Sequence, residues 1–194
     1  MRYGDDAIAI ARSSYDIQSA IPGMAEGALA TFTYQGALLA KAGKTNAAEA
    51  TEYMGTSYNI FKDYANKIGQ GKWVQQLTGQ TTHAVKIFKT TTSAMGAAFK
   101  SLGSMGVQMD VGMPEQIAAQ GTLQATMSVP EAGTAYKSML DKYDQAQKVL
   151  GTSFKNADGK MLPTYEIISK IDNKLGNLDK DQKVAALTKA FISI

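Results

Sequence analysis

The sequence has no cysteine and a single histidine among its 194 residues. The absence of cysteine excludes disulfides, thiol catalysis and cysteine-ligated zinc sites. The one histidine, His83, excludes metal sites that need several histidines, and it is the only candidate for a histidine base. No nucleophile or orienting acid accompanies His83 in a local motif, so we expect no catalytic role for it. We therefore predict a protein that is not an enzyme, with no catalytic, cofactor-binding or metal-binding residues.

Arginine is also scarce, since Arg2 and Arg12 are the only arginines among the 20 basic residues, and the net charge is just +3. Proteins that bind specific nucleic acids rely on arginine forks and gather their basic residues on one face. Here lysines alternate with acidic residues, as in 141–144 and 179–183, a pattern typical of a solvated helix face. Specific binding to nucleic acid is therefore not expected.

Long apolar segments are missing as well. The longest stretches without charge, 27–40 and 116–130, are shorter than the roughly 20 apolar residues that a membrane helix needs. The N-terminus carries Asp5 and Asp6 before any apolar run, which argues against a signal peptide. We expect no membrane span in this segment.

Helical periodicity dominates what is present. Capping boxes at Asn46 and Ser128, a capping threonine at Thr91 and glycine stops at Gly43 and Gly151 indicate a series of helices. The expected helices cover 24–42, 47–68, 82–90, 94–103, 113–127, 129–150, 163–176 and 180–194, with one near 8–21, a short turn at 73–77 and a loop at 106–112. No repeat period or heptad pattern emerges, which argues against a solenoid or a long coiled coil.

Glycine is abundant while proline is rare, with 18 and 4 residues respectively. Each glycine inside a helix costs up to about 1 kcal/mol relative to alanine. One interpretation is that these glycines let neighbouring helices approach closely; the other is that they weaken helices that repack between two states. The glycines expected inside helices are Gly27, Gly36, Gly55, Gly96, Gly121 and Gly133.

Only residues 152–162 suggest β structure. Asp158 and Gly159 are suited to a tight hairpin turn, and we assign them a structural role. A calcium loop is excluded, because its first and twelfth positions would be Phe154 and Tyr165 rather than carboxylates. The predicted fold class is all-α, an irregular multi-helix domain with one small β-hairpin near 152–162.

Residues 91–129 are rich in methionine and hold only three charged residues. Such a segment is either core or an adaptable contact surface, because methionine fits irregular partners. The two interpretations stay open, and the candidate contact residues are Met95, Met105, Met109 and Met113.

The C-terminal third carries an ordered set of motifs: a helix, a glycine stop, a D-G turn, a proline-led helix and an alanine-rich helix ending in Ala-Phe. These motifs stand at 131–140, 150–154, 156–163, 167–171 and 182–191, and softer similarity covers 11–22, 28–52 and 116–126. In these residues the sequence resembles the core region of phage tail tape-measure proteins, also called phage minor tail proteins.

The resemblance implies a structural component of a bacteriophage or prophage tail. Similar proteins extend inside the tail tube, set its length during assembly and leave on infection to help DNA cross the cell envelope. The implied partners are further copies of the chain and the tail-tube and tail-assembly proteins, and the implied location is the virion tail, assembled in the host cytoplasm. The alternative is a secreted, membrane-active helical protein of a phage-like injection system.

The chain is expected to form a single helical tape-measure core domain over 1–194. Within it we expect an N-terminal helical part, 1–112, and a helix–hairpin–helix part, 113–194. The abrupt apolar C-terminus suggests a fragment of a longer protein. Long measuring helices and hydrolase motifs, which some similar proteins have, do not occur in this segment.

Overall fold

The computed structural model describes residues 7–25 and 27–192, and within that part it contains twelve α-helices and no sheet. In chain order the helices are α1 (Ala7–Ala20), α2 (Ala28–Ala42), α3 (Ala47–Ile60), α4 (Lys62–Ile68), α5 (Gln70–Phe88), α6 (Thr92–Leu102), α7 (Met105–Gln108), α8 (Met113–Gln124), α9 (Val129–Asp141), α10 (Tyr143–Leu150), α11 (Thr164–Leu175) and α12 (Lys180–Phe191). The prediction of an all-α protein is confirmed.

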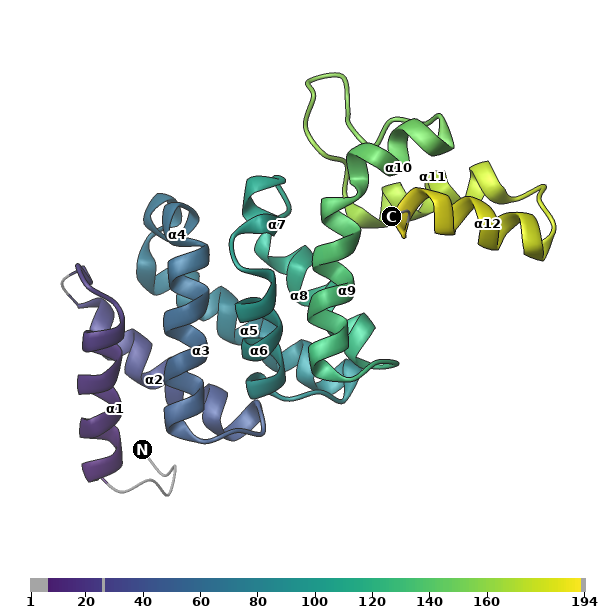
Figure 1. Cartoon of the computed structure of the whole chain (residues 1–194). Helices are drawn as coiled ribbons and strands as arrows, with labels where there is room; N and C mark the ends of the chain where they lie inside the picture. Colours follow the sequence, from purple (N-terminus) through teal and green to yellow (C-terminus); the bar gives the residue numbers. More distant parts are fainter. Residues whose placement is uncertain (1–6, 26, 193–194) are drawn as a thin grey trace.

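The helices up to α9 form two layers (Figure 1). Helices α1, α3, α6 and α9 stand side by side in one layer, and α2, α5 and α8 pack in the same order behind them. Three helix pairs, α2–α3, α5–α6 and α8–α9, therefore stack in a row, with starts about 40 residues apart as in helical solenoids. The sequence shows no repeat at this spacing, and for that reason a solenoid was not expected. The helix pairs nevertheless stack in a solenoid-like order.

The predicted capping residues act as caps, although the capping box at Asn46 is only half formed, because the Glu49 carboxylate accepts hydrogen bonds from Thr45 and Ser93. The Asn46 side chain accepts a hydrogen bond from the Glu49 backbone N–H at 2.9 Å, and Thr91 accepts one from Ala94 at 3.1 Å. Each satisfies one of the four N–H groups that the first turn of a helix leaves without a partner. These signals located the starts of α3 and α6.

Several predicted helix boundaries were wrong. The expected helix over 47–68 breaks at Phe61, whose ring is buried edge-on against Phe99 at 5.7 Å between centroids. The expected helix over 129–150 breaks at Lys142. Conversely, α5 runs unbroken through Gly79, because the buried stripe that includes Trp73 and Leu77 continues beyond it to Ala84 and Val85. Burial of this stripe outweighs the cost of one helical glycine.

Two further corrections concern the loops. Gly27 does not lie inside α2; it has φ +77° and precedes the first helical residue, Ala28. The segment expected to be a loop at 106–112 contains the last three residues of the one-turn helix α7.

The predicted β-hairpin at 152–162 was also wrong. The chain does turn at Gly159, where φ is +79°, but Lys155 and Met161 form only one isolated antiparallel bridge. The Asn156 side chain accepts hydrogen bonds from the Asp158 and Lys160 N–H groups, both at 3.0 Å, so it holds the loop locally. Phe154 is the only fully buried side chain in this segment. The segment therefore lacks the alternating apolar face that would hold two strands against the helices.

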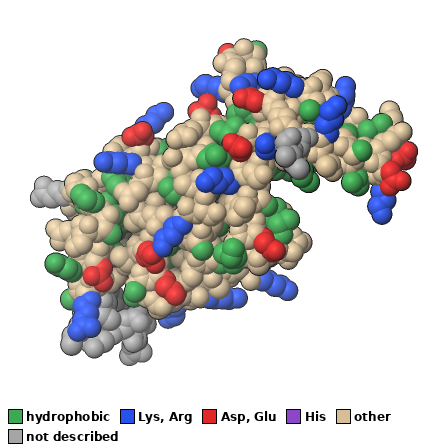
Figure 2. Space-filling model, viewed as in Figure 1, with side chains coloured by type: hydrophobic (Ala, Val, Ile, Leu, Met, Phe, Trp, Pro, Cys, Tyr) green, Lys and Arg blue, Asp and Glu red, His purple; other side chains and the backbone are tan. Residues whose placement is uncertain are grey.

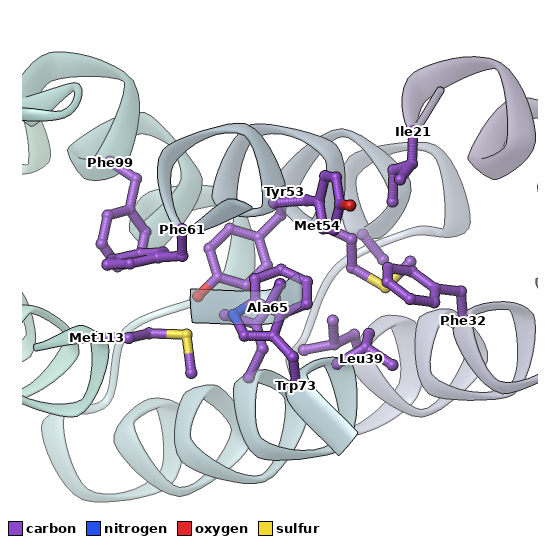
Figure 3. Packing of buried hydrophobic residues seen from close by; sticks show 14 of the residues in the cluster. Ile21, Phe32, Leu39, Tyr53, Met54, Phe61, Ala65, Trp73, Phe99 and Met113 are labelled. Carbon is purple, nitrogen blue, oxygen red and sulfur yellow. The ribbon is translucent and has the colours of Figure 1, made fainter. Parts of the chain in front are cut away.

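Two hydrophobic clusters form the core. The first centres on Phe32, Tyr58 and Trp73, whose rings contact one another with centroids 5.5 to 6.3 Å apart. Figure 3 shows Phe32 and Trp73 in this cluster. The second includes Tyr136, Leu140, Tyr143, Phe154 and Ile167. Leu102 and Val111 belong to the second cluster, whereas Met113 and Ile117 belong to the first. The predicted division after residue 112 therefore does not coincide with the division between the clusters.

Interior glycines lie where helices approach one another, as the first interpretation of them predicted. A Cβ on Gly133 of α9 would stand 2.9 Å from the Ser101 Cβ of α6, closer than real Cβ contacts. A Cβ on Gly121 of α8 would stand less than 3 Å from three ring atoms of Phe88 in α5. Gly36, Gly55 and Gly96 face Met54, Ala20 and Tyr53 respectively.

Candidate interaction surface

The structure separates the four candidate methionines into two groups. Met95 and Met113 are 0% and 1% exposed and belong to the first hydrophobic cluster. Met105 and Met109 are partly buried and pack against the second cluster. In this conformation only Met105 and Met109 reach the surface, so Met95 and Met113 act as core residues here. The role of Met105 and Met109 in contacts with another molecule stays a prediction.

His83 lies on the exposed side of α5, in a shallow hollow. The hollow is also lined by Thr82, Lys44 and Lys86, and no carboxylate is among its lining residues. Lys86 stands in the last turn of α5 and Lys44 just beyond the end of α2, where positive charge complements the helix dipole. Within residues 7–25 and 27–192, no group of three or more metal-ligating side chains comes together.

Apolar surface dominates a groove between α8, α9 and α11, which we call the C-terminal groove. It has a volume of about 550 Å³, within the range of ligand and docking sites. Its lining comprises Pro114, Glu115, Ala118, Ala119, Thr122, Leu123, Tyr136, Met139, Pro163, Thr164, Tyr165 and Ile168. Glu115 is the only charged residue among them.

Helix periodicity explains how the groove forms. Ala118 and Thr122 stand one turn apart on α8, so small side chains form one wall. Tyr165 and Ile168 form part of the opposite wall on α11 and are 69% and 55% exposed. The space-filling view shows apolar side chains at the surface over the C-terminal helices (Figure 2).

A carboxylate fixes the position of α11 against α8. Glu115 of α8 accepts a hydrogen bond from the backbone N–H of Thr164, the first residue of α11. A negative charge at this position also complements the positive end of the helix dipole. The contact links residues 49 positions apart and holds the two walls of the groove together.

Buried hydroxyls lie beneath the groove. The hydroxyl oxygens of Tyr136, Tyr143 and Thr164 are buried, and none has a hydrogen-bond partner among the described residues. Burial raises the pKa of Tyr143 to about 12, while the nearby Thr164 hydroxyl acts in the opposite direction. Burial likewise raises the pKa of Tyr136. These hydroxyls are therefore neutral at physiological pH.

Sequence reasoning missed the C-terminal groove, although part of its signal was visible. On α11, Ile167 and Leu175 point into the core, whereas Tyr165 and Ile168 are apolar residues outside that stripe. A second apolar stripe on one helix indicates a second contact. The walls on α8 carry alanine and threonine, which give no comparable signal.

A search for membrane-spanning helices and comparisons with known proteins complete this description. Among the described residues, no helix combines the length and the apolar character required to cross a membrane. No match to the chain was found among curated proteins or among solved structures. By contrast, the family model for phage-related minor tail proteins matches residues 1–191. Because this match covers almost the whole chain, the protein belongs to the phage-related minor tail protein family, whose members are structural components of phage tails.

Proposed function

We propose that this chain is the core domain of a tail tape-measure protein in a bacteriophage or prophage. In this role it takes part in tail assembly, in setting the length of the tail and in DNA ejection. The observation that carries the proposal is the minor-tail family match over 1–191, together with the ordered C-terminal motifs that resemble tape-measure proteins.

The proposed action is structural rather than catalytic. The proposed contact sites are helix surfaces, among them the apolar C-terminal groove. The proposed partners are further copies of the chain and the tail-tube and tail-assembly proteins. The proposed location is the virion tail, assembled in the host cytoplasm.

The stacked helix pairs suit a protein that changes between compact and extended forms. Each pair contacts the next one along the row, so an extended form would separate the pairs step by step and open the first cluster, which runs from α1 to α8. The interior glycines lower the intrinsic stability of α2, α3, α6, α8 and α9, because each costs up to about 1 kcal/mol relative to alanine. Such helices would unfold more readily inside a narrow tube.

Deletion of the segment in the phage tests the proposal. An in-frame deletion of 28–192 from the parent gene is expected to give particles without tails or with tails of altered length in electron micrographs. Supplying the intact gene in trans should restore normal tails. A phage with a Gly79→Ala substitution serves as a matched control, because nothing lies within 4 Å of a Cβ at that position. Normal tails from the deletion mutant would rule out the structural role.

A further inference from the structure

The C-terminal groove lies where the row of stacked helix pairs ends. In such a row, each pair covers the apolar side of the pair before it. After the last pair, α8–α9, this position is only partly filled by α11. Ala118 and Thr122 on α8 and Ile168 on α11 remain exposed along the groove. The groove is therefore an incompletely covered end of the stack.

Helix α12 presents an apolar face that its own chain leaves uncovered. Val184 and Leu187 stand three residues apart, on one side of the helix, and are 56% and 37% exposed. Ala190 is the only fully buried residue of α12, and it joins the second hydrophobic cluster. The helix thus holds to the rest of the molecule by one side and exposes apolar residues on another.

The charges of α12 and of the C-terminal groove are complementary. Lys180 and Lys183 stand one turn before Val184 and Leu187, and α12 carries three lysines against a single acidic residue, Asp181. The only charged residue that lines the groove is the carboxylate Glu115. A second carboxylate stands at the groove wall, because the Tyr165 hydroxyl donates a hydrogen bond to Glu166 at 3.0 Å. A basic, apolar helix therefore matches an acidic, apolar groove in both respects.

We propose that the C-terminal groove binds α12 of a second copy of this chain, with Val184 and Leu187 against the α8 wall. The occupant comes from another copy because both surfaces are exposed in the same molecule. The proposal rests on the proposed self-association and names its interface. A helix of 12 residues is only about 18 Å long, so one such contact is small and concentration-dependent association is expected.

The test compares the self-association of the wild-type chain with that of two variants in the proposed interface, which we call the interface variants. Val184→Lys places a charge on the apolar face of α12, and Ala118→Arg fills the groove and repels the lysines of α12. The matched controls are Ile87→Lys on α5, where the side chain is 54% exposed, and Ala97→Arg at an exposed alanine of α6. Sedimentation velocity and light scattering measure the mass of each chain at protein concentrations up to ~1 mM, where even weak contacts are populated. Circular dichroism verifies that each variant is folded.

The wild-type mass should rise above 20.7 kDa with concentration, and both controls should behave in the same way. Each interface variant alone should remain at 20.7 kDa. An equal mixture of the two should form a dimer, because one variant keeps an intact α12 and the other an intact groove. If either variant unfolds, Leu187→Lys or Thr122→Arg replaces it.

Three results would overturn the interface: a monomeric wild type, loss of association in only one of the two variants, or a mixture that stays monomeric. The measurement requires no phage. Its failure would therefore leave the proposed tail function standing, whereas normal tails after deletion would reject that function and leave the interface intact.

Discussion

Gly121 offers the sharpest test of how the stacked helices pack. A Gly121→Ala substitution in α8 places a methyl group less than 3 Å from three ring atoms of Phe88, including Cγ at 2.9 Å. Because Cγ itself is too close, rotation about the Cβ–Cγ bond cannot relieve the clash, and the ring or the helices must shift. The matched control is Gly79→Ala in α5, where a new Cβ meets no atom within 4 Å.

The two substitutions are expected to change the free energy of unfolding in opposite directions. Replacement of a helical glycine by alanine stabilises a helix by up to about 1 kcal/mol, so Gly79→Ala should raise the free energy of unfolding. At Gly121 the same gain is opposed by an overpacking cost of about 1–3 kcal/mol and by lost burial of Phe88, which packs against the first cluster. We expect a net loss of roughly 1–2 kcal/mol at Gly121, and a difference of about 2–3 kcal/mol between the two variants.

Urea denaturation measures this difference. Trp73 is the only tryptophan and is fully buried in the first cluster, so its fluorescence reports on that core, while circular dichroism reports on all helices. In a chain of this size, 1 kcal/mol shifts the melting temperature by about 2–4 °C. If Gly121→Ala and Gly79→Ala stabilised the protein equally, the claim of close packing between α5 and α8 would be refuted.

The remaining predictions concern buried hydroxyls and one cap. Tyr53→Phe should destabilise the protein by about 1 kcal/mol in urea melts, because the buried Tyr53 hydroxyl forms a hydrogen bond of 2.7 Å with the Thr81 hydroxyl. Tyr143→Phe should instead be neutral or stabilising, because it removes a buried hydroxyl that has no hydrogen-bond partner. Burial raises the pKa of Tyr143 to about 12 from an ordinary value of 10.0. Ionisation of Tyr143 therefore leaves the free energy of unfolding unchanged below pH 10 and lowers it between pH 10 and 12, as the unfolded chain loses the proton first. The loss is about 1.4 kcal/mol per pH unit, and thermal melts over pH 8–12 should show a shallower decline in Tyr143→Phe; equal slopes would contradict the assigned burial effect. The Asp179 side chain accepts a hydrogen bond from the Gln182 N–H at 2.9 Å and so caps α12. Asp179→Ala should therefore lower the free energy of unfolding by about 1 kcal/mol and increase hydrogen exchange in α12. Unchanged exchange would contradict the capping role.

Local signals in the sequence predicted the helices better than their lengths. Asn46 and Thr91 located helix starts correctly, because capping depends only on residues within one turn. The break at Phe61 could not be predicted in this way, since it follows from burial against Phe99, 38 positions further along the chain. The hairpin prediction failed for a related reason: a suitable turn does not form strands without an alternating apolar face.

The interaction surface was harder to predict than the fold. Met95 and Met113 fit either a core or a surface from sequence, and only the packing of the first cluster shows that they are buried. The C-terminal groove depends on how α8 and α11 meet through Glu115 and Thr164, a contact between distant residues. Composition and periodicity describe each helix separately and carry no information about such a junction.

The presence of this chain in assembled tails tests the account most directly. Tails purified on a density gradient from the phage that encodes it should be analysed by quantitative mass spectrometry. The account predicts peptides from residues 7–192 at a constant ratio to the tail-tube protein in every tail fraction. Tails of normal length that contain none of these peptides, both in mature particles and in assembly intermediates, would contradict it.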